Sequence, residues 1–102
     1  VDIRKGSPTY GKHLSIELSA ENKRQLLIPQ GFAHGYSVLS ETAEVFYKCD
    51  AFYNKASEGG ISLHDANLGI DWKIPAQDQV ISDKDLLYPE FNDHTGNFTF
   101  KK

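Results

Sequence analysis

Alternation of apolar and polar residues with a period of two most constrains the fold of this chain. Residues 14–19 read LSIELS, so their apolar and polar side chains would lie on opposite faces of a strand. The short stretch SET at residues 40–42 separates two further candidates and predicts a hairpin. The other predicted strands, interrupted by polar or glycine-containing turns, are residues 25–28, 35–39, 43–53 and 61–63.

Short strands with turns every 8 to 12 residues are typical of antiparallel sandwiches and barrels, including the cupin-type jelly roll, an antiparallel double-sheet barrel. About six strands would make only half to two-thirds of such a barrel. We therefore expect one all-β domain over residues 1–102 that is an incomplete jelly roll. Because an open barrel leaves sheet edges that invite pairing, we also expect a homodimer or a missing N-terminal half.

Charge and composition exclude several function classes. The net charge of −3 argues against a nucleic-acid partner, and no apolar run approaches the ~20 residues that cross a membrane. A single cysteine, Cys49, fits a reducing cytoplasm. The chain has no methionine and opens with VDIRKGSP as though already inside a strand, so we expect residues to be missing upstream.

His34 and Tyr47 are the first candidate site residues. Two hairpin registers match the apolar faces of residues 35–39 and 43–53, and they place His34 opposite Tyr47 or one diagonal step away, roughly 5 to 8 Å apart at Cβ. The pair fits an acid/base or substrate-binding role, and equally two satisfied polar residues on a mixed core face. Tyr47 is protonated at neutral pH and suits a general acid, although an aromatic strand residue with its hydroxyl at the surface is the simpler reading.

The charged residues further along the chain can be explained by structural roles alone. Ser82-x-x-Asp85 matches a capping box at the start of a single helical turn in SDKDLLY, and this pattern favours a cap over a carboxylate that orients a histidine. Lys84 and Glu58 would ordinarily be solvated surface charges.

A metal site is not expected. Residues 29–34 fit the P-x-G-x-x-H motif of metal-binding cupins, but such a site also needs an upstream H-x-H…E motif, which these 102 residues lack. His13, His64 and His94 have no mutual spacing that suggests metal ligands.

Four stretches together resemble the dTDP-4-dehydrorhamnose 3,5-epimerase family. They are VDIRKGSPTYGK, LSAENKRQLLIPQGFAHGYSVLSETAEVFYK, LGIDW and ISDKD, and they carry the resemblance to about residue 85. The final stretch from residue 86 resembles nothing informative.

The resemblance implies a fold and a reaction. Members of this family are cupin-type jelly rolls that form homodimers by strand exchange and use no metal or cofactor. Their substrate is dTDP-4-dehydro-6-deoxy-D-glucose, in which a C4 ketone makes the C3 and C5 protons acidic. A histidine held by an aspartate removes these protons, a lysine steadies the enolate, and a tyrosine returns protons from the opposite face.

Carried over position by position, the resemblance assigns a catalytic or substrate-binding role to each of six residues. Tyr47 matches the proton-donating tyrosine and Asp85 the carboxylate of the His–Asp dyad. The residues that match substrate contacts are His34, Lys84, Glu58 and Tyr53, the last as the aromatic that stacks on the thymine ring.

The departures from the family pattern limit what this chain does alone. The base histidine lies in an upstream R-G-L-H-type motif and the enolate-stabilising lysine is also upstream, so none of the four histidines inherits the base role. His64 stands where the family often has tryptophan. We therefore expect the 102 residues alone to be inactive. The alternatives are a related dTDP-sugar 3- or 5-epimerase or ketoisomerase, a non-catalytic nucleotide-sugar-binding cupin module, and a metal cupin.

Overall fold

Four short helical elements and two isolated β-bridges make up the regular structure of the computed structural model, which describes residues 1–101. The bridges pair Asp2 with Phe32 in antiparallel fashion and Lys5 with Thr99 in parallel fashion. The helical elements are η1 (Lys55–Ser57), η2 (Ala76–Asp78), α1 (Asp83–Leu86) and η3 (Phe91–Asp93). None of the helices among these residues is long and apolar enough to cross a bilayer.

The single helical turn predicted within residues 82–88 is confirmed as α1. Ser82 is its N-cap, and the Ser82 hydroxyl accepts the backbone N–H of Asp85 at 3.2 Å. Asp83 and Asp85 place two carboxylates in the first turn, where they favour the partial positive charge of the helix start. One turn of helix is therefore specified by residues that lie next to one another in sequence.

The first residues of the chain join two distant segments. Ile3 N–H donates to Gly31 O and Lys5 N–H donates to Phe98 O, both at 2.9 Å, so this segment lies between residues 31–33 and 98–100. Gly31 has a positive φ of 86° and would place a Cβ 2.4 Å from the Arg4 side chain, so a larger residue would not fit there.

A buried carboxylate stabilises this junction. Asp2 is 2 % exposed and accepts a bidentate pair of bonds from Arg4 at 2.9 and 3.0 Å. The hydroxyls of Ser7 and Thr9 each donate to the same Asp2 oxygen at 2.6 Å. The Arg4 guanidinium and these hydroxyls hold the pKa of Asp2 far below its usual range, so Asp2 stays ionised although it is buried.

A second buried carboxylate organises the small core. Asp65 accepts the backbone N–H of Phe91 at 2.6 Å and that of Asn67 at 2.7 Å, and these bonds lower its pKa. The Phe91 ring is buried and lies 5.0 Å from the ring of Tyr10. This carboxylate therefore joins the loop after residue 60 to the start of η3.

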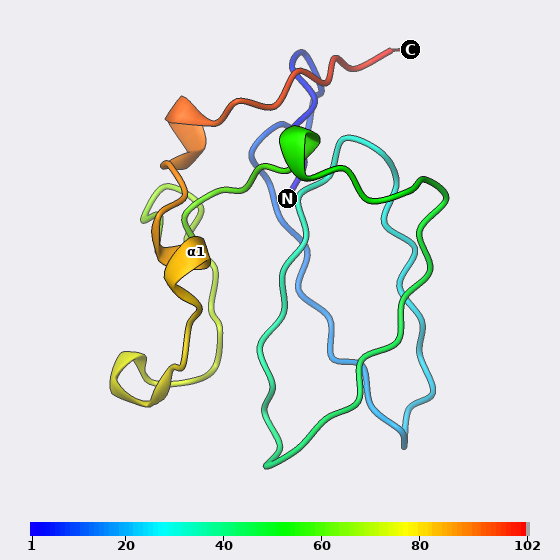
Figure 1. Cartoon of the computed structure of the whole chain (residues 1–102), viewed down its shortest axis with the longest axis vertical. Helices are drawn as coiled ribbons and strands as arrows, with labels where there is room; N and C mark the ends of the chain where they lie inside the picture. Colours follow the sequence, from blue (N-terminus) through cyan, green and yellow to red (C-terminus); the bar gives the residue numbers. More distant parts are fainter. Residues whose placement is uncertain (102) are drawn as a thin grey trace.

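The segments predicted as strands have no β-ladder in residues 1–101. Figure 1 shows residues 12–53 as elongated loops that extend away from the helical elements. Their apolar side chains are exposed, including those of Leu14, Leu27 and Phe46. A strand needs a neighbouring backbone and a covering layer for its apolar face, and the described residues supply neither here. The jelly roll stays a prediction.

Candidate functional site

Three of the six predicted site residues lie together in the structure. The Tyr53 hydroxyl donates to Glu58 Oε2 at 2.9 Å, and the Lys84 ammonium binds the other oxygen, Glu58 Oε1, in an ion pair. Glu58 therefore bridges a phenol and an ammonium that are 31 positions apart in sequence. We call these three residues the Glu58 cluster.

The charges in the Glu58 cluster reinforce one another. The ion pair with Lys84, followed by the hydrogen bond from Tyr53, lowers the pKa of Glu58. The bond to Glu58 raises the pKa of Lys84, and the hydrogen bond to Glu58 raises the pKa of Tyr53. At neutral pH the cluster holds a carboxylate, an ammonium and a protonated phenol. The Lys84 and Glu58 side chains are 56 % and 30 % exposed, so solvent and small ligands can reach them.

Local structure explains how residues five positions apart meet. Asn54 caps η1, and its side-chain oxygen accepts the N–H of Ala56 at 3.0 Å. Glu58 N–H then donates to Lys55 O at 3.2 Å and ends the turn. This single turn brings the two ends of the segment together, so the Tyr53 hydroxyl reaches the Glu58 carboxylate.

The third member comes from α1. The Ser82 cap fixes the first turn of this helix, which carries Lys84 at its second position. Asp85 follows directly, but its carboxylate is exposed and has no hydrogen-bond partner among residues 1–101. Asp85 thus follows Lys84 in α1, and within residues 1–101 no histidine bonds to its carboxylate as a His–Asp dyad requires.

His34 and Tyr47 do not meet in the structure. No hydrogen bond or ring contact joins them within the described part of the chain, because the hairpin predicted to pair them is not formed. The His34 ring lies 6.2 Å from that of Tyr36 instead, and Tyr47 is 76 % exposed on the elongated loops. Desolvation lowers the pKa of His34, which favours its neutral, hydrogen-bonding form.

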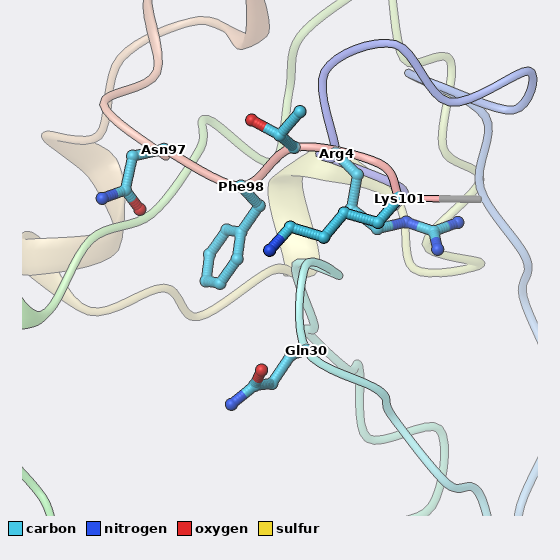
Figure 2. Close-up of a pocket in the computed structure, with 6 residues that line it drawn as sticks. Arg4, Gln30, Asn97, Phe98 and Lys101 are labelled. Atoms are coloured by element: carbon cyan, nitrogen blue, oxygen red, sulfur yellow. The ribbon is translucent and has the colours of Figure 1, made fainter.

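An open pocket lies away from the Glu58 cluster. Its volume is about 520 Å³, and Figure 2 shows the residues that line it beside the C-terminal segment. Its Arg4 guanidinium is already bound to Asp2 and lies 4.6 Å from the Phe32 ring centre. The lining residues, none of them a predicted site residue, are Arg4, Gln30, Asn97, Phe98, Thr99 and Lys101.

Within residues 1–101, no three His, Cys, Asp or Glu side chains converge as metal ligands would. His64 is hydrogen-bonded through Nε2 to Gln79 Oε1 at 2.8 Å, so its ring donates to a neutral amide oxygen.

Comparison with known proteins decides the family. A family model described as dTDP-4-dehydrorhamnose 3,5-epimerase matches residues 1–93. The chain belongs to this family. The match contains all six predicted site residues. It also extends beyond residue 85, and an epimerase of the same name from Sinorhizobium fredii aligns with all 102 residues at 40 % identity, so the expectation that the last stretch resembles nothing informative is wrong.

Curated relatives agree with this assignment. The chain is 54 % identical over 93 residues to a dTDP-4-dehydrorhamnose 3,5-epimerase of Shigella flexneri, covering 91 % of this chain and 50 % of that protein. It is 52 % identical over 89 residues to an epimerase of the same name from Salmonella typhimurium, covering 87 % and 48 %. The chain thus spans about half the length of these relatives. No solved structure gave a significant match.

Sequence reasoning did not identify Tyr88, whose ring packs against Gly60 in the loop that carries Glu58. The paired glycines Gly59 and Gly60 directly after Glu58 were the available signal, because glycine often marks a close approach of the backbone to another group.

Proposed function

We propose that the complete protein containing this chain is an isomerase that epimerises C3 and C5 of dTDP-4-dehydro-6-deoxy-D-glucose. Its product would be dTDP-4-dehydro-L-rhamnose, in dTDP-L-rhamnose biosynthesis. The observation that carries the proposal is the family match across residues 1–93, which includes every predicted site residue.

The chemistry follows from the C4 ketone. Removal of a proton from C3 or C5 leaves a carbanion that delocalises as an enolate onto the ketone oxygen. Return of a proton to the opposite face inverts the carbon. A positioned acid and base lower the barrier of such steps by proton transfer in the transition state.

Tyr47 and Asp85 carry the proton-transfer roles of this chain. Tyr47 returns the proton, because a positioned phenol can donate its proton to a carbanion. Asp85 orients the base histidine, which the complete protein supplies from sequence upstream of residue 1. The 102 residues alone therefore lack the main catalytic group and are inactive.

The Glu58 cluster and His34 bind the substrate. Glu58 holds Tyr53 by its hydroxyl, and the ring is largely exposed, so a ring face is free to stack on the thymine base. Lys84 adds a positive charge beside this ring, which suits a nucleotide sugar with an anionic diphosphate. The neutral imidazole of His34 offers a hydrogen bond to the sugar.

The complete protein is also proposed to be a cytoplasmic homodimer with a jelly-roll fold that uses no metal or cofactor. The exposed apolar side chains on residues 14–53 support this architecture, because alternating apolar faces of this kind need a covering layer. Light scattering coupled to size exclusion would give the dimer mass, and a monomer would contradict this part of the proposal.

Product NMR with the complete protein tests the reaction. Inversion at both C3 and C5 is expected. Inversion at one carbon would instead indicate a 3- or 5-epimerase, and a displaced carbonyl would indicate a ketoisomerase. Absence of turnover together with dTDP binding that survives Tyr47→Phe would indicate a nucleotide-sugar-binding module.

A further inference from the structure

The loop that carries Glu58 lies directly against the ring of Tyr88, which follows α1 in the sequence. A Cβ added at Gly60 would fall 2.5 Å from Tyr88 Cδ2 and Cε2 and 2.7 Å from Cζ. No side chain fits at these distances, so the close approach requires glycine at residue 60. The contact involves ring carbons of Tyr88.

Contacts on both sides of this ring join the same two segments. On the N-terminal side of both segments, Glu58 binds Lys84. On their C-terminal side, Ser62 N–H donates to Pro89 O at 2.7 Å. Tyr88 therefore lies between an exposed ion pair and a backbone hydrogen bond, at the middle of the seam between residues 58–62 and residues 84–89.

The exposed ion pair needs this support. A solvated Lys–Glu pair contributes little to stability and loses side-chain entropy when it is held in one geometry. Glu58 nevertheless bonds to Tyr53 and Lys84 at once, which requires its backbone to be fixed. The Tyr88 ring contacts that backbone two residues away, at Gly60.

We propose that Tyr88 is a positioning residue, whose ring holds the Glu58 loop so that Glu58 contacts both Tyr53 and Lys84. This inference rests on the proposed function for its effect on substrate, but the positioning itself does not depend on turnover. The ring carries the role, so phenylalanine should replace Tyr88 without loss, whereas alanine should not.

The test uses the complete protein with Tyr88→Ala, Tyr88→Leu and Tyr88→Phe, and Leu87→Ala as the matched control. Leu87 is the exposed neighbour on the same segment. Steady-state kinetics should show KM raised about three- to tenfold for Tyr88→Ala and Tyr88→Leu, with kcat within about twofold, because the lost contacts act on binding. Tyr88→Phe and Leu87→Ala should match the unsubstituted protein.

A second measurement requires no substrate. The ionisation of Tyr53 is followed by NMR in the ligand-free protein, with its signal assigned by loss in Tyr53→Phe. Because the bond to Glu58 raises the pKa of Tyr53, the Tyr53 midpoint should fall toward its ordinary value in Tyr88→Ala and Tyr88→Leu and stay raised in Tyr88→Phe.

The outcomes separate the two proposals. If Tyr88→Ala does not fold, the test of the positioning role rests on Tyr88→Leu, since leucine retains apolar volume without the ring. An unchanged Tyr53 midpoint and an unchanged KM in the folded ring-less variant would overturn the positioning role. A shifted midpoint in a protein without epimerase activity would support the positioning role and refute the proposed function.

Discussion

Residues 14–53 and residues 54–93 contrast sharply in how their side chains are partnered. In the second region, Glu58 pairs with Lys84, Asp65 accepts the N–H of Phe91, and Trp72 Nε1 donates to Leu63 O at 2.8 Å. In the first region, large apolar side chains from Leu14 to Tyr53 are exposed. The second region is held by contacts between segments up to 26 positions apart, whereas the predicted strands of the first region form no ladder within residues 1–101.

The contrast also divides the proposed roles. The proton donor Tyr47 lies on the elongated region, and the Glu58 cluster joins the end of that region to α1. Three of the proposed substrate-binding residues therefore already contact one another, while the proposed proton-transfer roles of Tyr47 and Asp85 depend on the complete protein. The predictions below test this division in the complete protein.

Tyr47→Phe should have the largest effect. Loss of the phenolic proton removes the acid, so kcat should fall by about 10²- to 10⁴-fold while KM changes little. Tyr36→Phe removes a hydroxyl from the same region and serves as the control. A kcat loss for Tyr47→Phe no larger than that of the control would assign the proton donor elsewhere.

Asp2→Asn should cost the most stability. Asn cannot satisfy Arg4, Ser7 and Thr9 as the carboxylate does, so the free energy of unfolding should fall by about 3 kcal/mol. Denaturant unfolding measures this loss.

The sign of the pH effect follows from the lowered pKa of Asp2. Its stabilisation is complete above the unfolded value near 3.8 and is lost as the pH falls toward the folded value. The Asn variant should therefore lose less stability on acidification than the unsubstituted protein. Equal acid sensitivity of both proteins would contradict the role of this buried carboxylate.

Glu58→Gln should weaken substrate binding without changing the chemical step. The amide is neutral and no longer pairs with Lys84, so KM should rise about tenfold with kcat nearly constant. Glu41→Gln, an exposed carboxylate on the elongated region, is the control. A fall in kcat with unchanged KM would show that Glu58 takes part in proton transfer.

The Glu58 cluster should also respond to pH in a defined window. The pKa of Glu58 is lowered, so its contribution is present above about 4.5 and lost as the pH falls through its folded value. The pKa of Lys84 is raised, so its contribution is present below about 10.5 and lost as the pH rises through its folded value. The contribution of the Glu58–Lys84 pair to KM should therefore be constant between these limits, measured as the difference from the profile of Glu58→Gln.

Ser82→Ala should have the smallest effect. Loss of the capping hydroxyl leaves the Asp85 N–H with only its backbone bond to Ser82 O, which costs about 1 kcal/mol. Ser82→Thr keeps a capping hydroxyl and should retain most of the stability. Thermal unfolding compares the two variants, and equal melting temperatures would contradict the capping role.

Residues close in sequence account for most of what could be predicted. The Ser82 cap and the turn of α1 depend on a four-residue pattern, and the structure confirms them. Lys84 and Glu58 looked like ordinary surface charges by pattern alone. Only the family resemblance assigned them to a site, and their contact spans 26 positions.

The features that could not be predicted from the sequence depend on long-range contacts. The pairing of His34 with Tyr47 rested on a hairpin register, and a register holds only when both strands have neighbours. The junction at Asp2 and the packing of Tyr88 on Gly60 join segments far apart in sequence, so no local period indicates them.

Hydrogen exchange at the substrate carbons tests the central claim most directly. The complete protein and the 102-residue chain are each incubated with dTDP-4-dehydro-6-deoxy-D-glucose in D2O, and deuterium at C3 and C5 is measured by NMR. The complete protein should label both carbons, and the 102-residue chain should label neither above the rate without protein. Labelling by the 102-residue chain at the rate of the complete protein would contradict the claim that the base lies outside it.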